Sequence, residues 1–236
     1  MTTAAMPGSA GRADRTPPWK RTLLAPTLTK QCWGFMIGST LFGLGSAPWL
    51  GIWMGAANAN ICYFIGAWFF TGAGLVQVIN SGAVSVAVDY PPGRMVRAEW
   101  LAASAQSFGT LLFNVSTTSA VAAHTLAAEK HLVWSPDAGG SVAFLISGVF
   151  VIVAYSHDNR LWNPTDVAWW AGQVNMLGCI AFGVSAVGAY ITPDGNTVDD
   201  VLANTGTFVG AVCFFVASLI VLPMWSTRAR DRQRVR

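Results

Sequence analysis

The sequence carries little charge for its length. Asp, Glu, Lys and Arg make up 11% of its 236 residues, whereas a soluble domain typically carries about 25%. None of the 14 basic or 11 acidic residues lies well inside the long apolar runs that fill most of the chain. Ionisable groups at bilayer depth mark proton and ion pathways, so their absence argues against an ion-coupled pump.

Signatures of catalysis and of cofactor binding are also absent. The four cysteines (Cys32, Cys62, Cys179 and Cys213) lack CxxC spacing, and we interpret them as packing residues. The apolar runs contain no opposed histidines for haem, and no phosphate-binding loop, dinucleotide fingerprint or hydrolase motif occurs. We therefore predict no cofactor, no metal, no catalytic residue and no enzymatic activity.

One group of residues has side chains of the kinds that bind metals. His124, Glu129, His131 and Asp137 fall in a single predicted loop, and histidines combined with carboxylates can ligate metals. Their spacing follows no paired-ligand pattern. Solvated loop residues are the preferred interpretation.

The sequence contains six long apolar runs, and the length of each is close to the ~20 residues that a helix needs to cross a bilayer. They cover residues 31–50, 58–80, 100–123, 139–156, 167–190 and 201–224. The first is too long for a signal-peptide core, so we expect it to stay as an uncleaved span. The sequence predicts an all-α fold: a polytopic transmembrane bundle of six helices.

The basic residues divide unevenly between the two sides of such a bundle. With six spans, thirteen of them fall in the two tails and in the second and fourth loops, and Lys130 alone falls on the opposite side. The positive-inside rule then places both termini in the cytoplasm of a bacterial plasma membrane. The arginine-rich tail, 226–236, is expected to attract anionic lipid headgroups rather than nucleic acid.

A glycine followed four residues later by phenylalanine occurs once in every apolar run. Four residues are about one helical turn, so each pair forms a notch beside a knob on one helix face. Small residues permit close helix packing in lipid, and we predict that role here. The pairs are Gly38/Phe42, Gly66/Phe70, Gly109/Phe113, Gly140/Phe144, Gly178/Phe182 and Gly210/Phe214.

The regular spacing of these pairs predicts three two-helix repeats. Residues 1–30 form a cytoplasmic tail, 31–80, 81–156 and 157–225 form hairpin repeats one to three, and 226–236 form the basic cytoplasmic tail. Repeats of two helices have parallel topology. A six-helix bundle with rough three-fold pseudosymmetry is the expected arrangement.

Uncharged polar residues within the runs allow two interpretations. Gln106, Asn114, Gln173 and Asn175 are candidates for an intramembrane polar cluster lining a cavity. Alternatively, they form hydrogen bonds between helices, each contributing about 0.6 kcal/mol. The second interpretation is preferred.

The strings FMIGSTLFGLGS and YFIGAWFFTGAGLVQ resemble the short two-helix YrhK-like domain of bacterial membrane proteins. RAEWLAASAQSFGTLLFNVST and WWAGQVNMLGCIAFGVSA resemble uncharacterised multi-pass membrane proteins of actinobacteria. The resemblance implies membrane placement and brings no catalytic residue.

Together these features favour a multi-pass membrane protein with a non-enzymatic structural or interaction role. Its expected partners are the bilayer and either another membrane protein or further copies of the chain. A transporter or channel for a small uncharged solute is the alternative. A hydrated cavity lined by Gln106, Asn114 and Asn175 favours transport, and a dry centre favours the structural role.

Overall fold

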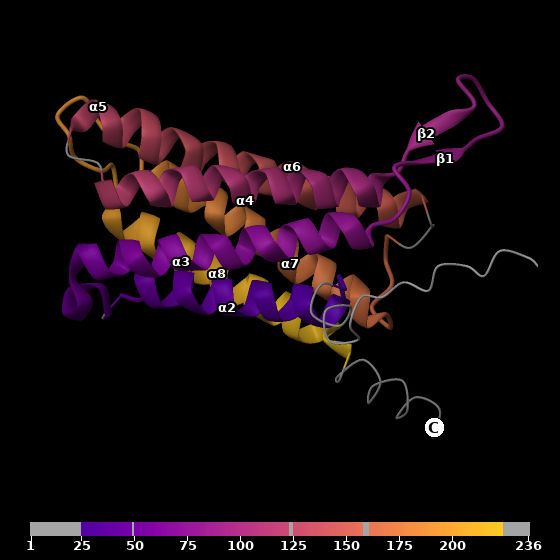
Figure 1. Cartoon of the computed structure of the whole chain (residues 1–236), viewed down its shortest axis with the longest axis horizontal. Helices are drawn as coiled ribbons and strands as arrows, with labels where there is room; N and C mark the ends of the chain where they lie inside the picture. Colours follow the sequence, from indigo (N-terminus) through magenta and orange to yellow (C-terminus); the bar gives the residue numbers. More distant parts are fainter. Residues whose placement is uncertain (1–24, 49, 123–124, 158–160, 224–236) are drawn as a thin grey trace, which may run out of the picture.

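Six long helices lie side by side in the computed structural model, which describes residues 25–48, 50–122, 125–157 and 161–223 (Figure 1). They are α2 (Leu28–Ser46), α3 (Leu50–Asn80), α4 (Ala98–Ala122), α6 (Ser135–His157), α7 (Val167–Gly188) and α8 (Asp200–Val221). The predicted all-α fold of six helices is confirmed. Most of the N-terminal tail and all of the basic tail, 226–236, lie outside the described residues.

Four of these helices are long and apolar enough to cross a membrane: Gly55–Asn80, Leu126–His157, Val167–Gly188 and Asp200–Val221. Polar residues lower the hydropathy of α2 and α4, although these helices have 19 and 25 residues. At 1.5 Å per residue even α2 is about 28 Å long, close to the ~30 Å of a bilayer core. Four such apolar helices are the pattern of a membrane-embedded protein.

The helix that contains the fourth apolar run begins well before residue 139. A short helix, α5 (Leu126–Ala128), leads into a π-helical turn, η1 (Glu129–Trp134), which continues directly as α6. Thr125 caps α5 by accepting a hydrogen bond from the backbone N–H of Ala128 at 3.2 Å. The prediction that Glu129, His131 and Asp137 are loop residues is wrong, because the charged residues interrupt the hydropathy but not the helical hydrogen bonds.

Helix α3 contains a break that separates its first turn from the rest. Gly55 has φ 72° and ψ 159°, a combination that is almost restricted to glycine. Residues on either side of it are helical. The break turns the chain from α2 into the long part of α3.

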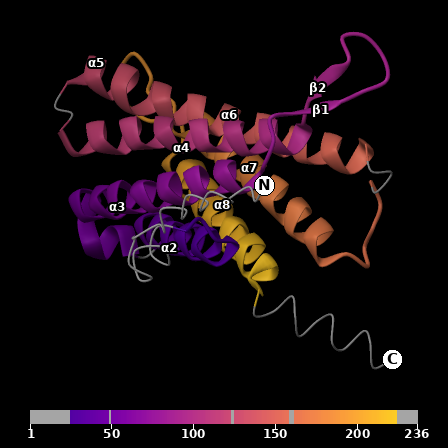
Figure 2. The same ribbon diagram turned by 45° about the vertical axis from the view of Figure 1, so that its right-hand side comes forward.

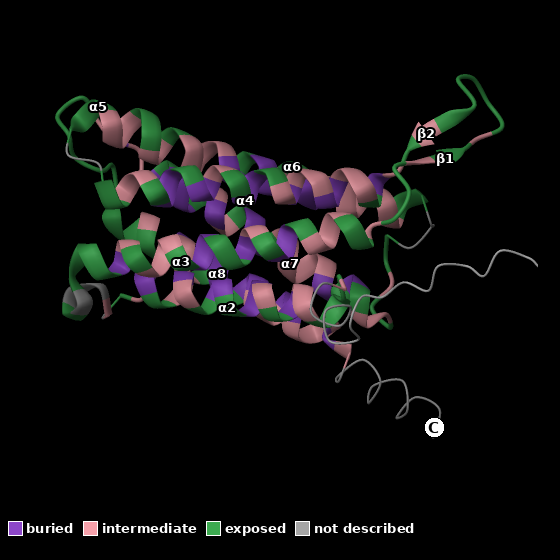
Figure 3. Cartoon of the chain, in the orientation of Figure 1, coloured by how far each residue is buried: buried purple, intermediate pink, exposed green. Residues whose placement is uncertain are grey.

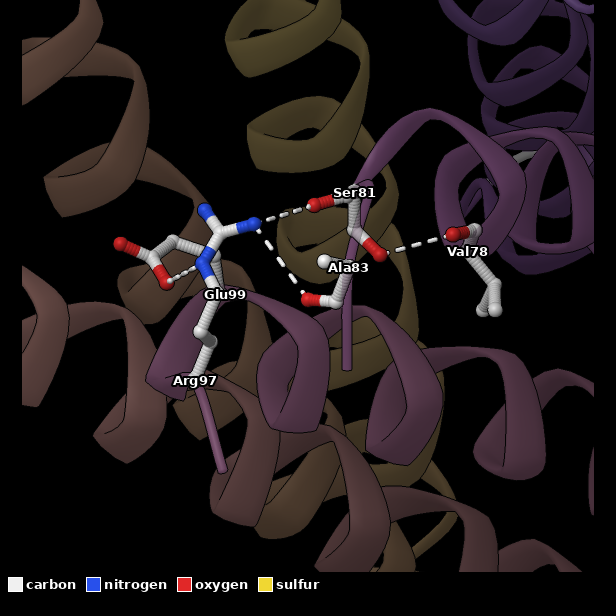
Figure 4. A network of polar contacts seen from close by, with 5 residues as sticks. All are labelled: Val78, Ser81, Ala83, Arg97 and Glu99. Carbon is white, nitrogen blue, oxygen red and sulfur yellow. Dashed lines mark hydrogen bonds and ion pairs between the residues drawn. The ribbon is translucent and has the colours of Figure 1, made fainter. Parts of the chain in front are cut away.

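Between α3 and α4 the chain forms a β-hairpin rather than a plain loop. Strands β1 (Ser85–Ala87) and β2 (Arg94–Val96) pair antiparallel, with Val86 opposite Met95. Arg97 fixes the base of the hairpin, because its Nη1 donates to the carbonyl oxygens of Ser81 at 3.0 Å and Ala83 at 3.4 Å (Figure 4). Its Nε lies 3.4 Å from a carboxylate oxygen of Glu99.

The six helices form a closed ring. α2 packs against α3 and α8, α4 against α3 and α6, and α7 against α6 and α8. Consecutive helices run in opposite directions, so α2 begins and α8 ends at the same end of the bundle as β1 and β2 (Figures 1 and 2). We call this the strand end, and the opposite end, where α5 lies, the α5 end.

The outer surface of the ring is apolar. Buried positions lie on the helix sides that face other helices, and exposed positions alternate with them (Figure 3). Large exposed side chains occur on every long helix and include Ile37, Trp68, Phe108, Val149, Leu177 and Val212. An exposed apolar surface of this extent marks a membrane or protein contact.

Candidate functional site

All six motif phenylalanines meet in the centre of the ring. They are Phe42, Phe70, Phe113, Phe144, Phe182 and Phe214, and each is at most 4% exposed. Neighbouring ring centroids are 5.0–6.3 Å apart in tilted or edge-on arrangements. Aromatic pairs of this geometry contribute about 0.5–1.5 kcal/mol each beyond their area burial. We call this group the phenylalanine plug.

The plug has two levels. Phe42, Phe113 and Phe182 come from α2, α4 and α7 and form a nearly equilateral triangle with centroid distances of 6.1, 5.8 and 6.3 Å. In the antiparallel partner helices, phenylalanine follows its glycine toward the strand end instead. There Phe214 contacts Phe70 at 6.2 Å and Phe144 at 5.3 Å. Each ring of the triangle comes from a different hairpin, since Phe42 lies on α2, Phe113 on α4 and Phe182 on α7.

Each motif glycine makes room for the phenylalanine of the facing helix in its own hairpin. A Cβ atom on Gly38 would lie 2.9 Å from the Phe70 ring, and one on Gly66 would lie 2.8 Å from the Phe42 ring. Both distances are shorter than any ordinary carbon–carbon contact. The α2–α3 pair is therefore held by two reciprocal contacts.

The same exchange recurs in the other two hairpins. A Cβ on Gly109 would be 2.6 Å from Phe144, and one on Gly140 would be 3.1 Å from Phe113. Corresponding distances are 2.6 Å for Gly178 with Phe214 and 2.7 Å for Gly210 with Phe182. All six pairs thus act at helix contacts inside the bundle.

The four predicted cluster residues do not come together. Gln106 accepts a hydrogen bond from the Ser147 hydroxyl of α6 at 3.3 Å, whereas Asn114 donates to the Thr71 hydroxyl of α3. Asn175 Nδ2 lies 3.7 Å from the sulfur of Cys179 within its own helix. Gln173 is half-buried on α7. Gln106 and Asn114 make the interhelical bonds of the preferred interpretation.

A cavity of about 380 Å³ with both polar and apolar lining lies at the α5 end of the ring. Phe42 of the plug forms part of its wall, and all six long helices contribute to it. The charged and amide side chains are Glu129, Asp137, Asn60 and Asn204. The remaining lining includes Tyr63, Trp134, Ser116, Thr117, Ser185, Thr197 and Thr207. We call this space the α5-end cavity.

Several of these lining groups are fixed by hydrogen bonds. Asn60 Nδ2 donates to the carbonyl oxygen of Ala120 at 3.3 Å, and the indole N–H of Trp134 donates to that of Ala186 at 2.9 Å. The Ser185 hydroxyl bonds to Thr207 at 2.7 Å. These bonds join α3 to α4, η1 to α7, and α7 to α8, so the wall is built across the helix contacts.

A second cavity, of about 430 Å³, opens at the strand end. Its polar lining residues are Gln31, Gln77, Asn80, Ser81, Glu99 and Tyr155. The Gln77 Oε1 atom is buried and has no hydrogen-bond partner. This strand-end cavity and the α5-end cavity lie at opposite ends of the bundle, with the phenylalanine plug between them.

The polar lining of the α5-end cavity was not found from sequence. Its amides and hydroxyls are scattered over four helices and the α7–α8 connection with no common spacing, and Asp137 was predicted to lie in a loop. One pattern in the sequence could have indicated it: Ser116 and Ser185 each lie seven residues after a motif glycine, Gly109 and Gly178 respectively. Both line the cavity.

Comparison with family models, with curated proteins and with solved structures finds no match to the chain. The resemblance to the YrhK-like domain stays a prediction.

Proposed function

We propose that the chain crosses the bacterial plasma membrane six times, with its termini in the cytoplasm, and has a non-enzymatic structural or interaction role. Lys30, Arg94 and Arg97 lie at the strand end, and Lys130 lies at the α5 end. Under the positive-inside rule this supports a cytoplasmic strand end. The duplication of one two-helix unit is part of the same proposal, supported by the reciprocal glycine–phenylalanine contacts in the three hairpins.

The observation that carries the structural role is the phenylalanine plug. Six packed rings fill the centre of the bundle, and the apolar exterior offers a surface for lipid or for a membrane partner. A second copy of the chain or another membrane protein is the expected partner. Anionic lipids are expected to bind the basic tail 226–236, beyond the described part of the chain.

Transport is the second candidate, and the two cavities favour it. Polar spaces at both ends separated by an apolar constriction form the arrangement of a closed gate. In this case Phe42, Phe113 and Phe182 block the pathway. The carboxylates of the α5-end cavity favour a cationic solute over the uncharged solute expected from the sequence.

Topology is tested with single cysteines in a variant that lacks the four native ones. Asn196→Cys, in the α7–α8 connection, should react with an impermeant maleimide on intact cells. Ser85→Cys, in β1, should react only after permeabilisation. Labelling of both, or of Ser85→Cys alone, on intact cells contradicts the proposed orientation.

The role is tested by purification from native membranes and by flux in liposomes. A stoichiometric partner, with no flux of small solutes, supports the structural role. Flux without a partner supports transport, and Phe113→Ala should then raise the rate, whereas Phe108→Ala on the outer face of α4 should not.

A further inference from the structure

We propose that the α5-end cavity binds a small organic cation, a primary or quaternary amine. The proposal concerns this cavity alone and is independent of whether the protein transports a solute or has a structural role. It rests on the charge of the lining, on its aromatic rings and on unpartnered polar groups.

The lining of the cavity contains acidic side chains and no basic one. Glu129 and Asp137 both line the cavity, and no Lys, Arg or His is among its lining residues. Within the part of the chain that the structure describes, the Asp137 carboxylate makes no hydrogen bond or ion pair. The nearby Lys130 ammonium lies 5.2 Å from the centroid of the Tyr190 ring instead. Even a half-buried carboxylate without a partner is costly, and a bound cation would lower that cost.

Aromatic rings supply a second contact for a cation. Tyr63, Trp134 and Phe42 line the same cavity. Trp134 is held by its bond to Ala186 and by an edge-on contact with Tyr190, whose ring centroid is 4.8 Å away. The faces of aromatic rings attract ammonium groups, most strongly when the site is desolvated.

A hydroxyl on a buried residue also lines the space without a partner. Ser116 is 4% exposed and lines the cavity, and its hydroxyl makes no hydrogen bond to any described residue. By contrast, the Thr117 hydroxyl bonds to the carbonyl oxygen of Phe113 at 2.8 Å. Buried polar groups are normally satisfied, so Ser116 is available to a polar substituent of the ligand.

The size and construction of the cavity fit an organic ligand better than a metal ion. Its volume of about 380 Å³ lies within the roughly 300–1,000 Å³ typical of small-molecule sites. No group of three His, Cys, Asp or Glu residues that could hold a metal occurs among the described residues. Glu129, Val133 and Trp134 reach the cavity from a π-helical turn, a feature frequent at functional sites.

Calorimetry on the purified full-length chain in detergent tests the proposal. The probes are ethanolamine, choline and the neutral analogue of choline in which carbon replaces the quaternary nitrogen. At least one cation should bind saturably and at least about ten-fold more tightly than the neutral analogue, because the carboxylates stay unpaired with the latter.

Variants locate the site. Asp137→Asn should weaken cation binding at least about ten-fold, and Glu129→Gln should weaken it in the same direction. Asp194→Asn, an exposed carboxylate outside the cavity, is the matched control and should bind like the parent. If Asp137→Asn fails to fold, Glu129→Gln and Ser116→Ala carry the test. The proposal is overturned if neither cation binds saturably, if the neutral analogue binds equally well, or if the cavity variants that fold bind like the control.

Discussion

The contact between Gly109 and Phe144 gives the sharpest test of how the bundle is held together. Gly109→Ala adds one methyl group at the crossing of α4 and α6. Its carbon would lie 2.6 Å from Phe144 Cδ1 and 2.9 Å from the carbonyl oxygen of Gly140. Carbon atoms pack at about 3.5–4.0 Å, so the Phe144 ring or the α6 backbone must move by about 1 Å.

Neither group can move easily. The Phe144 ring is fully buried, and its centroid is 5.0 Å from that of Phe113 and 5.3 Å from that of Phe214. Moving it disturbs the plug, whereas moving Gly140 separates two helices along their length. Overpacking of a dense interior typically costs about 1–3 kcal/mol. We expect a loss of that size in the free energy of unfolding.

Gly72→Ala is the matched control, because nothing lies within 4 Å of the added carbon. It lies in the middle of α3 and should be neutral or slightly stabilising, since alanine favours helix. Reversible unfolding in mixed micelles, followed by circular dichroism, measures both changes. Equal stability of the two variants would refute the packing role of Gly109. Gly109→Leu should lower the free energy of unfolding more than Gly109→Ala does. It should also lower it far more than Asn114→Gly, which removes an interhelical hydrogen bond worth about 0.6 kcal/mol.

Two further predictions concern the plug and the α3 break, and both are measured in the same unfolding assay. Phe144→Ala should lower the free energy of unfolding by about 3–5 kcal/mol because it opens a cavity beside three rings, those of Phe113, Phe182 and Phe214. Phe108→Ala, at a side chain that is 57% exposed on α4, should lower it much less, and similar losses would contradict the central position of Phe144. Gly55→Ala should cost about 1–3 kcal/mol because its φ of 72° is strained for any residue with a Cβ, and an unchanged midpoint would mean that the break is not required.

The helices and their packing faces could be predicted because both depend on local spacing. A glycine and a phenylalanine one turn apart share a face whatever the helix contacts. Which phenylalanine meets which glycine depends on the relative depth of two antiparallel helices. This relative position along the bundle axis is determined by the points where the two backbones approach most closely, as at Gly38 and Gly66. The residue pattern of one helix alone does not contain that information.

The β-hairpin was missed although the sequence contains a signal for it. Pro91, Pro92 and Gly93 form a turn signal between short segments rich in valine. Gly93 has φ 80°, a value that favours glycine in such a turn. The helices of a membrane protein are predicted from its long apolar runs, and that criterion does not detect two short strands in a polar connection between helices.

The misplacement of Asp137 has a physical cause that also explains why the polar cavity was hidden. A hydropathy run stops at the first charged residue, but a helix stops only where its backbone hydrogen bonds lose their partners. Asp137 therefore lies within the continuous η1–α6 helix, and it lines the α5-end cavity together with residues of the other five long helices. Asn60 and Ser116 line this cavity from α3 and α4, and their meeting depends on how the helices assemble rather than on their spacing along the chain. Which polar side chains share this cavity is a property of the assembled ring rather than of any one segment, so the spacing of residues along one helix could not reveal it.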